Sequence, residues 1–271
     1  MPESLLRYKY LPMNGNSLKV ISEGTMKFSS PSEFNDPFDC APDFDVKTNL
    51  EYISNNKDIF KKAGKKLGLS PGQRIQNRTK MLKNFERAAS KEDYGSQIAE
   101  KTGICCLSRE ALNLLMWAHY AKNHTGFVIE FCIPLTATGT IQEAEDCILK
   151  WLLPLEVTYT KDKPAINLND SQDESMQKQF LTKSKDWEYE QEERVIDYIR
   201  GSGIHSFDHK KIIKSIIAGI KMTDKKYSEL QSTVKSMNKQ LQTDVQVYRA
   251  IKTTGQYAIM VTERPDLTSS A

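Results

Sequence analysis

Short strand-like segments and charged helical stretches follow one another irregularly along this 271-residue chain. Clusters of β-branched and aromatic residues predict strands at 5–11, 25–28, 103–108, 126–133, 152–159, 194–199, 212–218, 245–251 and 257–261. Helices are predicted near 48–67, 72–100, 111–122, 169–185 and 224–240. Strands and helices do not alternate regularly, so the sequence predicts an α+β fold and not a doubly wound sheet.

A single α+β domain over residues 1–271 is expected, because a chain of this length can bury a substantial core. Its central sheet should be mostly antiparallel, continuous or split, with helices at its flanks. The segment 126–133 becomes fully apolar, which is typical of a central strand. Residues 48–101 are predicted to be a helical insertion, and 265–271 a loose tail.

The amino-acid composition indicates a globular protein and argues against a membrane protein. Hydrophobic residues make up 39% of the chain and charged residues 27%, which is typical of a globular protein. No apolar run approaches the roughly 18–20 residues of a membrane span, and Met1–Ser4 does not begin a secretory signal. We therefore expect a cytoplasmic protein without membrane contact. The five cysteines have no zinc-type spacing and are expected to be small buried hydrophobes.

Basic residues are concentrated in one part of the chain, although the net charge is only +3. Twelve of them lie between 57 and 101, at Lys57, Lys61, Lys62, Lys65, Lys66, Arg74, Arg78, Lys80, Lys83, Arg87, Lys91 and Lys101. This cluster could contact an acidic partner or a nucleic acid. The alternative is a solvated helix face, which is the more common role of such a run.

The first of three candidate motifs is the loop Phe28–Asp39. Two prolines stiffen it, and its polar groups are the hydroxyls, carboxamide and carboxylates of Ser29, Ser30, Asn35, Asp36 and Asp39. Such a loop could arrange donors and acceptors around a small ligand. Equally, it could form an Asx-type turn network that satisfies only its own backbone.

The second motif, Met116–Glu130, places Trp117, His119 and Tyr120 near the end of a helix that precedes a core strand. His119 and His124 are five residues apart, so one helix face would not present both to a metal ion. A candidate site residue and a hydrogen-bonded core histidine are both open interpretations of His119.

The third motif is Trp187–Arg194, in which Glu190, Glu192 and Arg194 alternate. They would share one strand face if the strand begins early. A carboxylate there could polarise a substrate hydroxyl or form a structural ion pair. We expect one glutamate to face Tyr120, Asn35 and Asp36, and the other to pair with Arg194. The three motifs are expected to converge in space.

Together with the opening Tyr8-Lys9-Tyr10, these segments resemble the bacterial family known as domain of unknown function 2971. The resemblance rests on the phrases Lys27–Asp39, Met116–Phe131 and Trp187–Arg194. The name of that family implies no activity.

The order of the motifs is similar to that of ADP-ribosyltransferase-like toxins, a likeness at the level of fold. It implies that Arg7 or Lys9 grips the nicotinamide ribose of NAD, that His119 or Tyr120 stacks on or positions it, and that Glu190 or Glu192 binds its 2′-hydroxyl. The implied site has Glu190, Glu192, His119 and Tyr120 as catalytic residues and NAD contacts at Arg7, Lys9, Ser29, Ser30, Asn35, Asp36 and Trp117. NAD is the expected cofactor, and no metal is expected.

Three hypotheses for function remain open. The favoured one is an NAD-using, ADP-ribosyltransferase-like enzyme, such as a toxin or antiphage effector. A nuclease or other phosphoester hydrolase would instead use a divalent metal held by carboxylates, with candidates at Asp36, Asp39, His119, His124 and Glu190. The third is a non-catalytic binding module, in which the aromatic phrases build the core.

Overall fold

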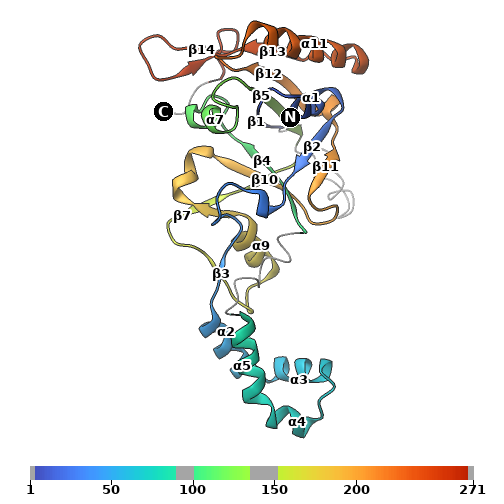
Figure 1. Cartoon of the computed structure of the whole chain (residues 1–271), viewed down its shortest axis with the longest axis vertical. Helices are drawn as coiled ribbons and strands as arrows, with labels where there is room; N and C mark the ends of the chain where they lie inside the picture. The colour runs from blue at the N-terminus through green and yellow to red at the C-terminus, as the bar shows by residue number, and fades with distance from the viewer. Residues whose placement is uncertain (1–3, 90–100, 135–151, 268–271) are drawn as a thin grey trace. The chain divides into compact units, whose positions relative to one another are not determined.

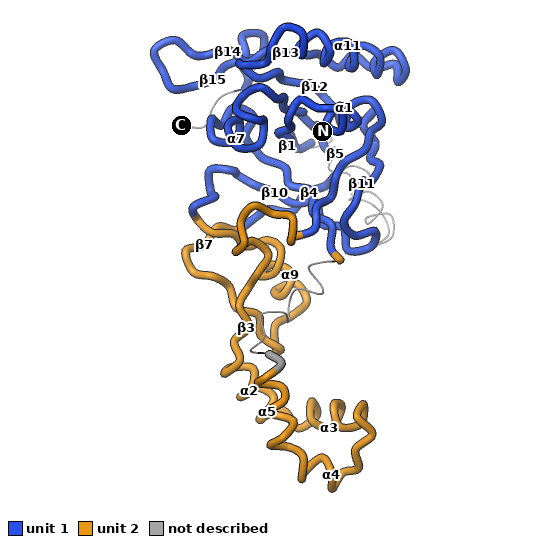
Figure 2. The backbone as a smooth tube through the Cα atoms, viewed as in Figure 1, with its two compact units in different colours: residues 1–30, 102–157, 186–271 blue, residues 31–101, 158–185 orange. Residues whose placement is uncertain are grey.

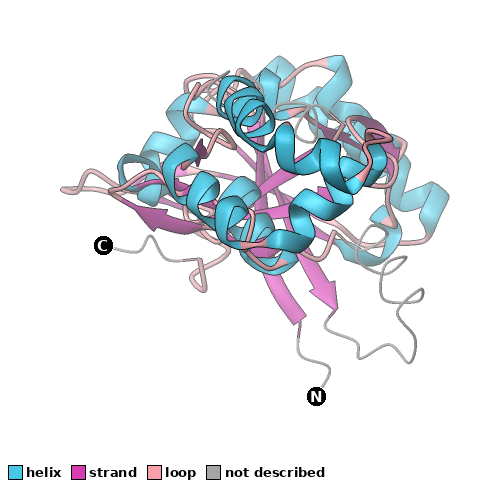
Figure 3. Cartoon of the chain, turned by 90° about the horizontal axis from the view of Figure 1, so that it is seen from below, coloured by secondary structure: helices cyan, strands magenta, loops and turns pink. Residues whose placement is uncertain are grey.

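A computed structural model of the chain describes residues 4–89, 101–134 and 152–267. Helices and strands both contribute throughout, so the fold is α+β (Figure 3). The chain divides into two compact units (Figure 2). The first unit comprises Met1–Ser30, Thr102–Val157 and Asp186–Ala271, and the second comprises Pro31–Lys101 and Thr158–Lys185.

Within the described residues, the first unit contains a seven-stranded sheet with the order β13-β12-β5-β1-β4-β10-β6 (Figure 1). The strands are β1 (Ser4–Leu11), β4 (Gly103–Ser108), β5 (Phe127–Pro134), β6 (Leu155–Glu156), β10 (Glu192–Asp197), β12 (Ile213–Ala218) and β13 (Gln246–Arg249). Neighbours in this sheet pair antiparallel except β12 and β13, which are parallel. The expected antiparallel sheet, with 126–133 in its interior, is confirmed.

The two faces of this sheet bury different clusters. Along β5, Phe127, Ile129 and Phe131 belong to one cluster and Val128 to the other, because side chains alternate along a strand. The first cluster packs against α1 (Gly15–Ser22) and α11 (Asp224–Leu241). The second, called here the tyrosine face, packs against α7 (Leu114–His119) and the segment 259–267. The sheet is therefore covered on both sides.

Smaller elements complete the first unit. β2 (Thr25–Phe28) pairs with β11 (Gly203–Ser206), and β14 (Ile251–Lys252) pairs antiparallel with β15 (Ile259–Met260). The short α10 (His209–Ile212) precedes β12, and the 3₁₀ turn η2 (Lys185–Glu190) precedes β10.

The second unit contains the helices expected in the basic region, but in shorter pieces. They are α2 (Val46–Asn55), α3 (Lys57–Lys66), α4 (Pro71–Gln76) and α5 (Arg78–Ala89). Residues 90–100 of the predicted insertion lie outside the described part. The predicted helix 169–185 is also shorter, because α9 (Gln172–Phe180) is followed by β9 (Thr182–Ser184). The remaining elements are η1 (Pro31–Glu33), β3 (Asp43–Phe44), β7 (Thr158–Thr160) and β8 (Ala165–Ile166).

Candidate active site

Asn113 fixes the start of α7 and the turn that carries the third motif. Its Oδ1 accepts hydrogen bonds from the backbone N–H groups of Leu115 and Met116, at 3.0 and 3.1 Å, as a helix N-cap does. Its amide nitrogen donates to the carbonyl of Tyr189 at 3.0 Å. One side chain thus joins the second motif to the third, and α7 begins at Leu114 and not at Ala111 as predicted.

Tyr120 and Glu190 meet where these two segments come together. The Tyr120 hydroxyl donates to Oε1 of Glu190 at 2.5 Å, and Glu190 is only 2% exposed. The Ser108 hydroxyl holds the same residue by donating to its backbone carbonyl at 2.7 Å. A buried carboxylate is costly unless it is hydrogen-bonded, so this contact fixes both partners.

The ring of His119 lies close to the rings of Tyr120 and Tyr189. The exposed His119 has its ring centroid 6.3 Å from that of Tyr120 and 6.2 Å from that of Tyr189. We call His119, Tyr120, Tyr189 and Glu190 the Tyr120–Glu190 cluster. Two of the residues predicted to be catalytic are bonded within it, and a third lies beside them.

Glu192 has a different partner from Glu190. Its carboxylate accepts two hydrogen bonds from Arg194, at 2.9 and 3.1 Å, and both residues are buried. Glu190 therefore binds Tyr120 and Glu192 binds Arg194, which is the expected division of these two partners. The expected approach of Asn35 and Asp36 to the same glutamate stays a prediction. The early strand start that would put all three charged residues on one strand face does not occur, because β10 begins at Glu192 and Glu190 lies in η2.

Buried polar residues form a row across five strands of the sheet. The pairings Ser215–Glu130, Glu130–Tyr8, Tyr8–Ser108 and Ser108–Glu192 run from β12 to β10. Directly paired residues point to the same face, so all five lie on the tyrosine face. The row therefore joins two buried carboxylates, Glu192 at one end and Glu130 near the other. Ser108, which binds the backbone of Glu190, lies between them.

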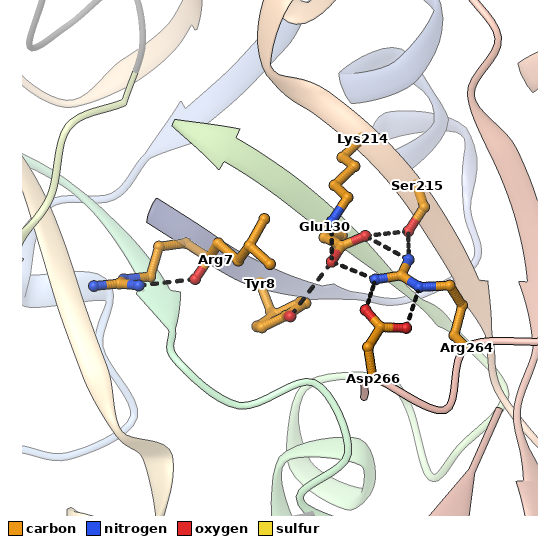
Figure 4. A network of polar contacts seen from close by, with 8 residues as sticks. Arg7, Tyr8, Glu130, Lys214, Ser215, Arg264 and Asp266 are labelled. Carbon is orange, nitrogen blue, oxygen red and sulfur yellow. Dashed lines mark hydrogen bonds and ion pairs between the residues drawn. The ribbon is translucent and has the colours of Figure 1, made fainter. Parts of the chain in front are cut away.

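Glu130 is fully buried and anchors a network that the sequence did not predict (Figure 4). It accepts hydrogen bonds from Arg264 at 2.8 and 3.0 Å, from Ser215 at 2.6 Å and from Tyr8 at 3.4 Å. Burial and the nearby carboxylate of Glu130 raise the pKa of Tyr8 well above its ordinary value. The only available signal was a carboxylate inside an otherwise apolar strand.

Arg7 and Lys9 point to the sheet face opposite Tyr8, because neighbouring strand residues alternate. Arg7 makes a two-pronged ion pair with Glu193, at 2.5 and 2.6 Å, and points away from the Glu130 network in Figure 4. Lys9 donates to the carbonyl of Cys106 at 2.7 Å. The structure therefore does not bring these two predicted NAD contacts together with Glu192 on the tyrosine face.

Trp117 and Ser29 have structural contacts. Trp117 is fully buried, donates from Nε1 to the carbonyl of Ala111 at 3.0 Å, and packs edge-on against Tyr10. The backbone of Ser29 exchanges two hydrogen bonds of 2.9 Å with Ile104. Ser30 is half-buried and is the last residue of the first segment of this unit.

In the second unit, Asn35 is exposed, whereas Asp36 is buried and accepts from the backbone N–H of Phe38 at 2.9 Å. This is the Asx-type turn considered for the loop. Asp39 lies 3.6 Å from Lys183, and both side chains are buried. Convergence of this loop with the other two motifs stays a prediction.

The remaining features concern metal binding, membrane spans and the pKa values of buried thiols and of His124. Within the described residues, no group of three or more His, Cys, Asp or Glu is arranged to hold a metal ion, and no helix is long and apolar enough to cross a membrane. Burial raises the pKa of the Cys105 and Cys106 thiols. Burial and the charge of Lys221 lower the pKa of His124, whose ring stacks on Trp117 with centroids 6.3 Å apart.

A family model described as protein of unknown function (DUF2971) matches residues 116–195. The matched region contains the second and third motifs, and with them the whole Tyr120–Glu190 cluster, so the resemblance to this family is confirmed there. Neither the curated proteins nor the solved structures include a match to the chain.

Proposed function

We propose that this protein is an NAD-using enzyme of the ADP-ribosyltransferase-like kind, in which Glu190 acts on the nicotinamide ribose. The hydrogen bond from Tyr120 to Glu190 carries the proposal. It joins residues 70 positions apart, each of which the motif order had assigned to this chemistry. A buried carboxylate beside exposed aromatic surface suits a substrate with sugar hydroxyls and a flat ring.

Glu190 would act through its negative charge. In the proposed reaction, the bond between ribose C1′ and the nicotinamide nitrogen breaks, and the bonding electron pair leaves with nicotinamide. A nucleophile of the target then bonds to C1′ and releases its proton to solvent. Positive charge develops on the ribose as the bond breaks, and a buried carboxylate stabilises it more strongly than one in water.

Tyr120 would hold the carboxylate ready for the substrate. An ionised carboxylate has about four lone-pair sites, so Glu190 can accept from a ribose 2′-hydroxyl in addition to Tyr120 or in exchange for it. His119 and Tyr189 would offer ring surface to the nicotinamide. Arg7 and Lys9, which are bonded within the sheet, are not included among the groups that touch NAD in this proposal.

Release of nicotinamide from NAD tests the proposal. The purified full chain would be incubated with NAD and a bacterial lysate as a source of target, and nicotinamide would be measured by chromatography. Glu190→Gln keeps the shape and removes the charge, so we expect at least an approximately 100-fold loss of rate. The control is Glu229→Gln, an exposed glutamate of α11. Equal rates for the two variants, or no release by the wild type, would refute the proposal.

The target and setting belong to the same proposal. We propose a toxin or antiphage effector that acts in the bacterial cytoplasm and meets an acidic or nucleic-acid partner through the basic helices between 57 and 101. Expression of the wild type in bacteria should lower cellular NAD and slow growth, and Glu190→Gln should do neither.

A further inference from the structure

The basic helices of the second unit carry a large net positive charge. Residues 57–87 contain ten Lys or Arg and two Asp or Glu, which is a formal charge of +8. The whole chain carries +3, so the other 240 residues sum to −5. The charge is therefore segregated into α3, α4 and α5.

Two of the ten cations hold these helices together. Arg74 packs across Gly64 of α3 and donates to the carbonyl of Leu69 at 2.9 Å. Arg78 donates to the carbonyl of Ser54 at 2.8 Å and lies over the Phe60 ring at 5.2 Å. These contacts connect α4 to α3 and α5 to α2 and α3. They leave eight cations on the outside of a packed helical platform.

The eight remaining cations are exposed and follow one another closely along α3 and α5, at Lys57, Lys61, Lys62, Lys65, Lys66, Lys80, Lys83 and Arg87. Steps of four residues on α3 place successive charges about 6 Å apart along the helix. Like charges at this spacing destabilise a helix by about 0.2–0.5 kcal/mol per pair. Within the described part of the chain, none of the five α3 lysines has a carboxylate at ion-pair distance. The repeated lysines of α3 therefore destabilise the helix that carries them. A charge pattern that does not serve stability indicates a function in binding.

We infer that α3 and α5 form a sequence-independent docking surface for the phosphate backbone of a double-stranded nucleic acid. A dense row of ammonium groups matches regularly spaced phosphates, and such contacts carry no base specificity. Single-strand binding would require open aromatic rings for base stacking. The rings available here make internal contacts, because Phe60 lies under Arg78 and Phe85 packs edge-on against Phe44.

This inference deepens the partner named in the proposed function and does not depend on the NAD chemistry. Fluorescence anisotropy of the full chain, without NAD, would be measured with labelled 20-base-pair DNA and RNA duplexes between 50 and 200 mM salt. Binding to either duplex, with affinity that falls steeply as salt rises, is the expected result. Comparing the two affinities shows whether the surface prefers DNA or RNA. A failure of NAD cleavage would leave this measurement unaffected.

The decisive comparison uses two variants that lose the same charge. The first replaces Lys61, Lys62, Lys65 and Lys66 of α3 with Gln. The second replaces four exposed lysines of α11 in the other unit, Lys225, Lys226, Lys235 and Lys239. We expect the α3 variant to bind about tenfold or more weakly, with a salt slope reduced by about four, and the α11 variant to bind within about twofold of the wild type.

Three results would overturn the inference. One is an equal loss in both variants, which would mean that net charge alone governs binding. Another is the absence of binding to either duplex at 50 mM salt. The third is tighter binding to single strands than to duplexes. Circular dichroism would confirm that both variants keep the helix content of the wild type.

Discussion

Arg264 places its guanidinium on the fully buried carboxylate of Glu130, with N–O distances of 2.8 and 3.0 Å. The two residues are 134 positions apart in the chain. Arg264 also binds Asp266, and it adds an ion pair to the apolar packing of Val261 and Leu267 that holds the segment after β15 on the tyrosine face. This pair couples the C-terminal part of the described chain to the centre of the core.

Replacing Arg264 with Leu should therefore destabilise the fold. The change leaves Glu130 charged and buried, with Ser215 at 2.6 Å and the ammonium of the more exposed Lys214 at 3.6 Å. Loss of one partner from a buried pair typically costs about 3–5 kcal/mol. We expect the free energy of unfolding, measured by urea denaturation, to fall by about 3 kcal/mol.

Two controls separate the buried pair from ordinary surface effects. Lys226→Leu breaks an exposed pair with Glu229 and should cost at most about 1 kcal/mol. The double variant Glu130→Leu/Arg264→Leu should be more stable than Arg264→Leu alone, since no buried charge is left without its partner. A double variant that is less stable than the single variant would contradict this account.

The same pair predicts how stability depends on pH. Burial alone would raise the pKa of Glu130, but hydrogen bonds from Arg264 and Ser215 and the charges of Arg264 and Lys214 outweigh it, so the pKa lies below its ordinary value of 4.5. A carboxylate with a lowered pKa in the folded state stabilises the fold above its unfolded pKa. That stabilisation is lost as pH falls through the folded pKa.

We therefore expect the unfolding free energy to decline as pH is lowered below about 5. Glu130→Gln removes the titrating group and should make this decline shallower, whatever its effect on stability at neutral pH. Glu229→Gln, a change at an exposed position of α11, is the matched control. Identical acid slopes for the wild type and Glu130→Gln would show that Glu130 does not contribute.

Tyr120→Phe tests the hydrogen bond of the candidate site. The variant keeps the ring and removes the hydroxyl that donates to the buried carboxylate of Glu190. Hydrogen bonds to charged groups contribute about 1.5–3 kcal/mol, so a loss of that size is expected in thermal or urea unfolding. Tyr257→Phe is the matched control, since Tyr257 is fully exposed and its change should stay within about 0.5 kcal/mol. Equal effects at the two positions would remove the argument for a structural Tyr120–Glu190 bond.

The sheet was predictable where local patterns determine it. Strands such as β5 and β12 are visible as short apolar runs, and the antiparallel class follows from the irregular spacing of helices. The strand order was not predictable, because pairs such as β5 with β12 join segments about 85 residues apart. Nothing in the local sequence near Arg264 indicates that its partner is Glu130.

The third motif shows why an alternating pattern can mislead. Glu190 and Glu192 have the spacing of two residues on one strand face. Gln191, however, adopts a left-handed backbone with φ of +46°, which strand pairing does not tolerate. β10 therefore begins only at Glu192. Because of this break the two glutamates have different partners: Glu190 binds Tyr120, and Glu192 binds Arg194. The sequence alone did not indicate the left-handed residue between them.

Strain next to the candidate site gives the last prediction. Lys122, Asn123 and His124 follow Tyr120 and have φ values of +47°, +55° and +65°. For a residue with a side chain, this conformation costs about 1–2 kcal/mol. Lys122 is exposed, so Lys122→Gly should relieve strain at little cost in contacts and raise the unfolding free energy by about 0.5–1 kcal/mol.

The same substitution inside a helix should have the opposite sign. Lys235 is exposed in the interior of α11, where Gly costs about 1 kcal/mol. Urea unfolding of Lys122→Gly and Lys235→Gly measures both effects, and destabilisation by both would show that the loop is not strained. Backbone strain is often retained where it orients functional groups. If it orients Tyr120 here, Lys122→Gly should release nicotinamide more slowly than the wild type although it is more stable, whereas Lys235→Gly should be less stable and equally active.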